Sequence, residues 1–299
     1  MKSNNILKGV AIIAVGAASY GMLATFVKLA YKEGYTTPEV TIAQLVIGFL
    51  LMTFYTLFKE KKQNKPILKL PKSDVLKLVI LGTSLGLTTL FYYLAVKYVS
   101  VSTAIVLLMQ TTWISVVLEC IIQKTFPSMQ KIIAVVLVLV GTVLTTNILG
   151  TEIQIDARGI IFGFLSAISF TTTMFASNKI ATYLPAYKKS SIMLLGGFLA
   201  ITIYNIIGYT GHFDFSIFYS WGIILAIFGT IIPPLAFNTG FPLTGLGLGS
   251  IVSATELPVS IIMAYFFLGE SVIGIQIAGI VLILGAIVLM NLKFKKQLA

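Results

Sequence analysis

Charged residues, histidine and cysteine are all scarce in this chain of 299 residues. Only 10% of the residues are charged, and there is one histidine and one cysteine. The single cysteine, Cys120, excludes an intramolecular disulfide and a cysteine-ligated metal cluster. The single histidine excludes an H-E-x-x-H zinc site, and no phosphate-binding G-x-x-x-x-G-K-[ST] motif occurs. We therefore expect a protein that is not an enzyme and that holds no metal ion or cofactor.

Hydrophobic residues, in contrast, make up 57% of the chain. The mean hydropathy of +0.98 exceeds what the core of a water-soluble protein needs. Apolar runs of about 20 residues, the length that crosses a ~30 Å hydrocarbon core, recur along the whole chain and leave no room for a soluble domain. We expect an all-α integral membrane protein with ten transmembrane helices, at 7–30, 39–58, 75–97, 102–122, 131–149, 159–181, 191–211, 221–240, 248–268 and 272–292.

The first apolar run has an alternative interpretation as a secretory signal. Lys2 and Lys8 precede the hydrophobic part of the run, and small residues at 17–19 resemble a cleavage site. The apolar stretch continues past these small residues to Ala30, whereas a signal needs only about 7–15 apolar residues. We therefore interpret this run as a retained helix.

The positive charges are distributed unequally between the two sides of the expected bundle. Of the 21 Lys and Arg residues, 17 fall on the side of the two termini, and the other side holds only Lys28, Lys32, Lys97 and Arg158. Because cytoplasmic loops are rich in Lys and Arg, this asymmetry predicts that both the N-terminus and the C-terminus are inside. We interpret the basic loop 59–74 as a topology signal that contacts lipid headgroups and not as a nucleic-acid site. The expected location is the cell (inner) membrane, as a multi-pass protein in the lipid bilayer.

The two halves of the chain, 1–149 and 150–299, form a weak internal repeat. Segment 98–124 aligns without a gap with segment 244–270, which places Gln110 opposite Glu256 and Thr112 opposite Pro258. Five helices are an odd number, so the second copy enters the membrane from the opposite side. The sequence therefore predicts two inverted five-helix repeats within one membrane domain, an architecture that many secondary transporters share.

The segment 229–285 resembles the EamA-type transporters of the drug/metabolite transporter superfamily. The features that carry the resemblance are two prolines, a Gly-rich stretch, a mid-helix proline, a terminal L-G-E and a Q-x-x-G sequence. In this chain they are Pro233 and Pro234, Gly245 to Gly249, Pro258, Leu268 to Glu270, and Gln276 with Gly279. The resemblance implies ten helices in two repeats and the transport of a small metabolite, amino acid or drug.

Polar side chains within the expected spans follow helical spacing. Ser253, Glu256 and Ser260 share one helix face, and similar stripes run along 84–92 and 166–177. Each hydroxyl alone can satisfy its own helix by bonding a carbonyl one turn earlier. Because polar groups at membrane depth normally face a cavity or another helix, we expect the stripes to converge on a polar cavity. The predicted substrate-binding residues are Glu256, Gln110, Gln44, Trp113, Tyr92, Thr88, Ser169, Thr173, Ser253 and Asn238.

Glu256 is the residue in this set with the strongest functional prediction. It lies about eight residues, or roughly 12 Å, from the end of the expected span, too deep to reach water easily. Such a carboxylate can couple solute movement to protons or hold the ammonium group of a substrate. The alternative is a neutral Glu that bonds a neighbouring helix as part of the structure.

Three prolines within the spans are candidate gating or hinge residues, because proline has no N–H for the helical hydrogen bond. We expect the run 221–240 to be discontinuous at Pro233 and Pro234, with the bend facing the cavity or another helix. Pro258 should leave the carbonyl of Ala254 free as a further acceptor near Glu256.

These observations predict a secondary active transporter, an exporter or exchanger that works by alternating access. Its expected substrate is a small organic metabolite such as an amino acid, with a proton or a counter-substrate as the coupled species. The alternative is a channel or a structural polytopic membrane protein with a polar core.

Overall fold

The computed structural model describes residues 3–63, 70–148, 156–207, 211 and 213–291, and its regular elements there are helices. Within this part, nine helices are long and apolar enough to cross a membrane, and Met129–Thr145 is a shorter apolar helix. At about 1.5 Å per residue its 17 residues span roughly 26 Å, slightly less than a ~30 Å hydrocarbon core. The predicted all-α membrane fold is confirmed. The predicted repeat boundary at 149/150 lies outside the described residues.

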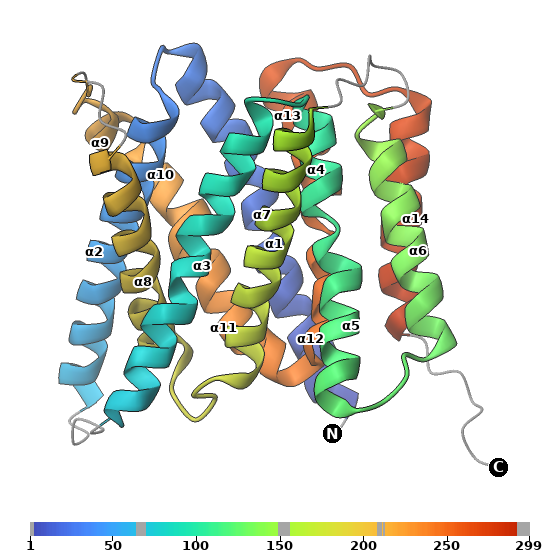
Figure 1. Ribbon diagram of the computed structural model, residues 1–299, viewed down its shortest axis with the longest axis horizontal. Coiled ribbons are helices and arrows are strands. Elements are labelled where there is room, and N and C mark those ends of the chain that lie inside the picture. Colours follow the sequence, from blue (N-terminus) through green and yellow to red (C-terminus); the bar gives the residue numbers. More distant parts are fainter. Residues whose placement is uncertain (1–2, 64–69, 149–155, 208–210, 212, 292–299) are drawn as a thin grey trace.

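The spanning helices stand side by side and alternate in direction (Figure 1). The first half contains α1 (Ser3–Lys32), α2 (Thr37–Gln63), α3 (Lys72–Val96), the span formed by α4 (Val101–Leu108) and α5 (Thr111–Gln123), and α6 (Met129–Thr145). The second half contains α7 (Ala157–Lys179), α8 (Ala186–Ile207), the short α9 (Ile217–Ser220), the span formed by α10 (Gly222–Ala226), η2 (Ile227–Ile231) and α11 (Ile232–Thr244), the span formed by α12 (Leu246–Ser253) and α13 (Glu256–Leu268), and α14 (Gly274–Asn291).

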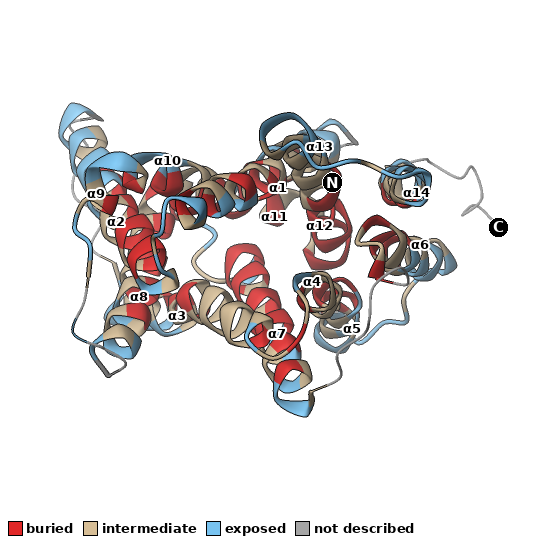
Figure 2. Ribbon diagram, turned by 90° about the horizontal axis from the view of Figure 1, so that it is seen from above, coloured by how far each residue is buried: buried red, intermediate tan, exposed pale blue. Residues whose placement is uncertain are grey.

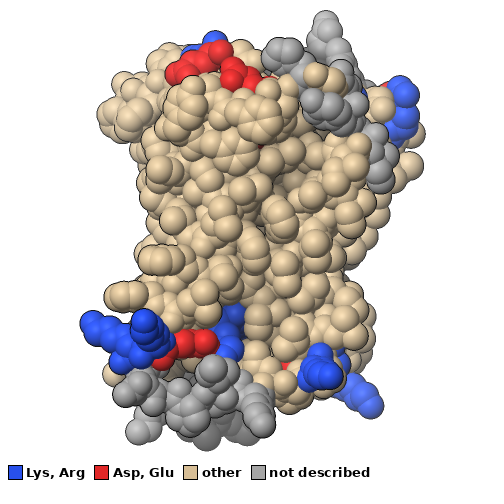
Figure 3. Space-filling model, turned by 90° about the vertical axis from the view of Figure 1, so that its left-hand side faces the viewer, with Lys and Arg blue, Asp and Glu red and all other residues tan. Residues whose placement is uncertain are grey.

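The two ends of the bundle differ in charge. The end where α1 begins and α14 ends also carries Lys124, Lys179 and Lys188, and we call it the lysine-rich end. Figure 3 shows mainly basic side chains at this lower end, acidic and basic side chains at the upper edge, and a belt of uncharged atoms between them. Exposed apolar side chains such as Phe54 and Phe266 belong to the sides of the bundle, where lipid would cover them. The assignment of the lysine-rich end to the cytoplasm stays a prediction.

Small residues allow the helices to pack closely, as is common between membrane helices. Gly82 and Gly86 place α3 directly against the backbone of α8 at Met193 and Gly197. The helices α6 and α14 pack against each other, and both views show this pair at one side of the bundle (Figures 1 and 2). The buried residues lie on the inward sides of the remaining helices (Figure 2). These helices therefore surround the centre of the molecule.

The spans α4–α5 and α12–α13 are interrupted at equivalent positions of the two repeats. At each interruption the backbone bonds three residues back instead of four, which tightens the helix locally. The N–H of Gln110 donates to the carbonyl of Leu107 at 3.1 Å, and the N–H of Thr255 donates to that of Val252 at 3.0 Å. Glu256 is the first residue of α13, and Gln110 directly precedes α5.

Pro258 explains the interruption in the second repeat, because it cannot donate to the carbonyl of Ala254. That carbonyl accepts a hydrogen bond from the N–H of Leu257 at 3.1 Å. The expectation that Ala254 provides a free acceptor is therefore wrong. The α4–α5 span contains no proline, so its interruption has a different local cause.

The predicted discontinuity near Pro233 and Pro234 takes the form of a π-helical turn and not of a gap. This turn, η2, ends one residue before α11 begins, and α11 carries both prolines in its first turn. A π-turn changes the hydrogen-bond register within a helix, and such turns are frequent at functional sites. Both prolines are buried.

Candidate functional site

A cavity of about 170 Å³ lies at the centre of the bundle. A single water molecule needs only about 10–15 Å³ on the same kind of measure, so the cavity has room for a small solute. Its described lining comes from α1, α2, α3, α4, α7, α8, η2, α11 and α13, and therefore from both repeats. The polar lining residues are Tyr20, Gln44, Thr88, Thr89, Tyr92, Tyr93, Thr173, Thr230, Glu256 and Ser260.

The cavity occupies the half of the bundle away from the lysine-rich end. The interrupted spans show this most clearly, because their lining residues belong to α4 and α13. Ile105 and Leu108 come from α4, and Leu257 and Ser260 come from α13. Both of these half-helices extend from the interruption toward the end opposite the lysine-rich end (Figure 1). The cavity therefore reaches from the middle of the bundle toward that opposite end.

Glu256 supplies the charge in the described lining of the cavity. Its carboxylate makes no hydrogen bond or ion pair with a residue that the structure describes, and Tyr20 and Tyr92 line the same cavity. Its position in the first turn of α13 favours a negative charge, because a helix N-terminus carries a partial positive charge. The sequence prediction thus placed Glu256 correctly beside a central cavity, while its role stays a proposal.

Gln44 is positioned in the cavity lining by a glycine of the π-turn. The amide of Gln44 packs onto Gly229, where an added side chain would collide with the amide nitrogen. Gly48, one turn further along α2, leaves room for Thr230 in the same way. The π-turn and α2 therefore fit together through two glycines, and this fit places an uncharged amide in the cavity wall.

Aromatic rings form much of the remaining wall. The ring of Tyr20 packs edge-on against Phe170 at 6.2 Å and against Phe237 at 5.8 Å between ring centres. On α3, Tyr92 and Tyr93 are neighbours with ring centres 5.9 Å apart. Tyr92 was predicted from the sequence, whereas Tyr20 and Tyr93 were not, because tyrosine in a membrane helix is also common at lipid interfaces.

The hydroxyl stripes of α3 and α7 face each other, and only part of them reaches the cavity. The Oγ atoms of Ser84 and Thr173 are 2.6 Å apart, and Ser169 donates to the carbonyl of Ser84 at 3.1 Å. Thr88 lines the cavity while bonding the same carbonyl at 2.7 Å. Thr173 also lines the cavity, whereas Ser169 serves the contact between the two helices.

Three further predicted residues lie outside the cavity lining. Gln110 donates to the carbonyl of Val106 at 2.9 Å and accepts a hydrogen bond from the indole of Trp113 at 2.8 Å. Trp113 is 38% exposed on the outside of the bundle. Ser253 is buried and donates to the carbonyl of Gly249 at 2.8 Å. The polar groups of Gln110 and Ser253 are therefore satisfied within their own helices.

Between the cavity and the lysine-rich end, three hydrogen bonds connect α7, α8 and α11 pairwise. We call this set the polar triangle. Its contacts are Lys189 Nζ to the carbonyl of Ser177 at 2.8 Å, Asn178 Nδ2 to the carbonyl of Phe241 at 2.6 Å, and Asn238 Nδ2 to Ser190 Oγ at 2.8 Å. Asn238, predicted to bind substrate, thus belongs to this layer. Lys189 is only 1% exposed, although its position near a helix end predicted a lysine at the membrane surface.

The polar triangle lies one helical turn from the floor of the cavity. Thr173, Leu194 and Pro234 line the cavity, and each is four residues from a member of the triangle on the same helix. Buried aromatic and aliphatic side chains fill the same layer, among them Met174, Phe237 and Phe241. Together the apolar packing and the triangle fill the layer between α7, α8 and α11 on the lysine-rich side of the cavity.

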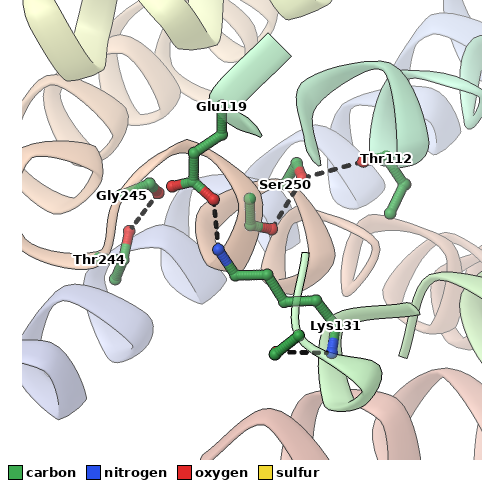
Figure 4. A network of polar contacts seen from close by, with 8 residues as sticks. Thr112, Glu119, Lys131, Thr244, Gly245 and Ser250 are labelled. Carbon is green, nitrogen blue, oxygen red and sulfur yellow. Dashed lines mark hydrogen bonds and ion pairs between the residues drawn. The ribbon is translucent and has the colours of Figure 1, made fainter. Parts of the chain in front are cut away.

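A second membrane carboxylate, Glu119, was missed by the sequence analysis. It is buried on α5 and forms an ion pair with Lys131 of α6 (Figure 4). Its carboxylate lies beside the start of α12, where side chains at Gly245 and Gly247 would meet its oxygens. Gly245 also has φ of +84°, a conformation that favours glycine. This network therefore joins α5, α6 and α12 at the lysine-rich end.

The sequence GTSLG at 82–86 matches the G-x-S-x-G pattern of serine hydrolases. That motif requires a strand–turn–helix that exposes the serine, whereas Ser84 is buried within α3. Its hydroxyl also bonds the carbonyl of Leu81 at 2.6 Å. Among the described residues, no three His, Cys, Asp or Glu side chains gather so that they could hold a metal ion.

Helical spans in two inverted repeats around a central polar cavity define a polytopic membrane transporter. The model of the EamA-like transporter family matches residues 7–147 and again residues 157–292. The chain therefore belongs to the EamA-like transporter family. The predicted membership is confirmed, as is the predicted multi-pass location in the inner membrane.

The chain is also similar to two individual proteins. An "Uncharacterized inner membrane transporter YicL" of Salmonella typhimurium (strain LT2) is 26% identical over 302 residues, covering 97% of both chains. A solved protein structure, described only as "Crystal structure of protein", has a TM-score of 0.78 at 14% identity and covers 95% of this chain and 98% of its own. The solved structure shows the shared fold. The family and the relative point to a transporter and not to an enzyme.

Proposed function

We propose that this transporter is a secondary carrier that exports or exchanges a small organic solute by alternating access through the central cavity. The observation that carries the proposal is the location of the cavity: it lies between the two repeats, beside both interrupted spans, and contains an ionisable group without a partner among the described residues. Interrupted helices at a repeat interface are a common setting for substrate sites in carriers.

The closed layer beneath the cavity favours a carrier over the alternative of a channel. A conducting channel needs a continuous path, whereas the polar triangle and Phe237 fill the space between the cavity and the lysine-rich end. We infer that the structure represents the state closed at that end. In the opposite state α7, α8 and α11 would separate, and the two ends would be open in turn.

Glu256 is our candidate for the coupling group. The titratable groups that share its cavity are the tyrosines Tyr20, Tyr92 and Tyr93, and no Lys, Arg or His is among the described lining residues. A carboxyl group that faces a cavity can take up a proton in one state and release it in the other. Proton exchange would then drive the solute in the opposite direction, with a counter-substrate as the alternative driving species.

The experiment begins with the solute. Metabolite profiling of cells and medium, with the protein overexpressed or deleted, identifies compounds whose distribution changes. The purified protein in proteoliposomes should then take up such a compound saturably, and the same compound inside the vesicles should accelerate uptake. Uptake that neither saturates nor responds to internal solute would instead indicate a channel.

The role of Glu256 is tested in the same vesicles. Glu256→Gln should keep the protein folded and abolish the pH dependence of transport. Exchange would persist in part if Glu256 only couples protons, and would cease if it also binds substrate. Glu270→Gln is the matched control, because Glu270 lies outside the described cavity lining and pairs with Lys28 at 3.0 Å. Wild-type flux and pH dependence in Glu256→Gln would leave only a structural role.

A further inference from the structure

The charge of the cavity limits the kind of solute that it can hold. Glu256 is the charged member of the described lining, and the other polar groups there are amide, threonine, serine and tyrosine side chains. The nearest basic residue along α1, Lys28, is exposed and paired with Glu270. An ionised Glu256 therefore has no cation to neutralise it among the described residues, and burying such a charge without a partner is costly.

The walls around Glu256 are suited to a positive charge with an apolar body. Tyr20 and Tyr92 line the same cavity as Glu256, and Tyr93 and Phe170 extend the aromatic surface. The faces of aromatic rings attract cations within about 6 Å, most strongly where water is excluded. The carboxylate and the rings therefore favour the same charge.

We propose that the solute of this transporter is an organic cation, a primary amine or quaternary ammonium attached to an aromatic or other apolar group. The cationic group would contact Glu256 between Tyr20 and Tyr92, and the apolar part would lie against Leu85, Leu108 and Phe170. This proposal rests on the proposed carrier function, since it names the substrate class of the same cavity.

The same lining residues disfavour the binding of anions and amino acids. A carboxylate or phosphate in the cavity would meet Glu256 and no basic side chain of the described lining. An amino acid could pair its ammonium group with Glu256, but its own carboxylate would then lack a positive partner. The N-terminal turn of α13, which could attract an anion, already holds Glu256 itself. An organic-cation substrate therefore excludes amino acids, which the sequence suggested as one example of a substrate.

The test uses four probes that share a phenyl group and differ in charge. They are benzyltrimethylammonium, benzyl alcohol, phenylacetate and phenylalanine, titrated by calorimetry into the purified full-length protein in detergent at one alkaline pH. The permanent charge of benzyltrimethylammonium makes its binding independent of its own protonation. We expect the affinity for this cation to be at least about tenfold higher than that for benzyl alcohol. Phenylacetate and phenylalanine should both bind more weakly than benzyl alcohol.

Substitutions of two glutamates distinguish a cation site at Glu256 from non-specific attraction of the cation to negative charge. Glu256→Gln should reduce the preference for the cation over benzyl alcohol to about threefold or less, whereas Glu270→Gln, which also removes one negative charge, should leave it unchanged. Glu256→Asp should retain the preference, and it replaces Glu256→Gln as the informative variant if the latter fails to fold. The cation site is rejected if wild type prefers phenylacetate or phenylalanine, fails to bind the cation, or keeps its preference in Glu256→Gln.

The binding experiments require no transport, so they test the cation site independently of the carrier function. A Glu256-dependent preference for the cation without solute exchange in vesicles would support the site and reject the carrier. Saturable exchange of an anion or a zwitterion would support the carrier and reject the cation site.

Discussion

Gly21→Ala tests whether the cavity depends on the direct contact between α1 and α13. A Cβ at position 21 would stand 2.5 Å from the carbonyl oxygen of Glu256, 2.9 Å from the Cβ of Val259 and 3.0 Å from the backbone nitrogen of Ser260. Ordinary contact begins at 3.4 Å, so the two helices must separate by about 1 Å. Backbone atoms cannot rotate away, and overpacking of this kind typically costs about 1–3 kcal/mol.

The same displacement moves the residue that carries the proposed function. A misplacement of about 1 Å can reduce catalysis about 100-fold, and we expect a roughly tenfold loss of solute affinity or transport. Thermal unfolding in detergent, followed by tryptophan fluorescence, measures stability, and vesicle flux measures function. Gly285→Ala in α14 is the matched control, because nothing lies within 4 Å of its added Cβ. The reasoning is refuted if Gly21→Ala matches wild type in both measurements or if Gly285→Ala is equally damaging.

Two further predictions concern the ends of the bundle. Glu119→Gln should destabilise the protein by about 1–3 kcal/mol, because it leaves the half-buried Lys131 without its partner. Adding Lys131→Met should recover part of this loss in unfolding experiments. Equal stability of the single and double variants would reject the pairing. In a Cys120→Ala background, single cysteines replacing the exposed Lys72 and Lys97 report the topology. We expect an impermeant thiol reagent on intact cells to label position 97 and not position 72, and the reverse result would overturn the orientation.

The sequence predicts the spans and the location of Glu256 well, because both depend on strong signals. An apolar run of about 20 residues has few alternatives to a membrane helix, and a carboxylate at membrane depth must face a cavity or a partner. Pro258 likewise marks the interruption before α13. The interruption between α4 and α5 has no such marker, since neither Met109 nor Gln110 is a helix breaker.

The rotation of each helix is harder to predict than its position. In a soluble helix the polar face points to water, but here both the lipid side and the protein side are apolar, so the pattern does not fix which face is inward. Gln110 and Trp113 were assigned to the cavity, and the structure places them in a contact with each other outside its lining. Lys189 illustrates the same difficulty, because a lysine near a helix end usually extends to the headgroups.

The opening and closing of the lysine-rich end is the central claim of this account, and a cross-link tests it most directly. Asn238 and Ser190 join α11 to α8 one turn below the cavity floor, with 2.8 Å between Nδ2 and Oγ. Cysteines at both positions, in the Cys120→Ala background, would form a disulfide that holds these helices together. A control pair at Thr145 and Gln276 joins α6 to α14, which are in contact but contribute nothing to the described cavity lining. We predict that oxidation stops transport in the 190/238 variant, that reduction restores it, and that the control pair transports in both forms. Undiminished transport with the 190/238 disulfide fully formed would contradict alternating access through this end.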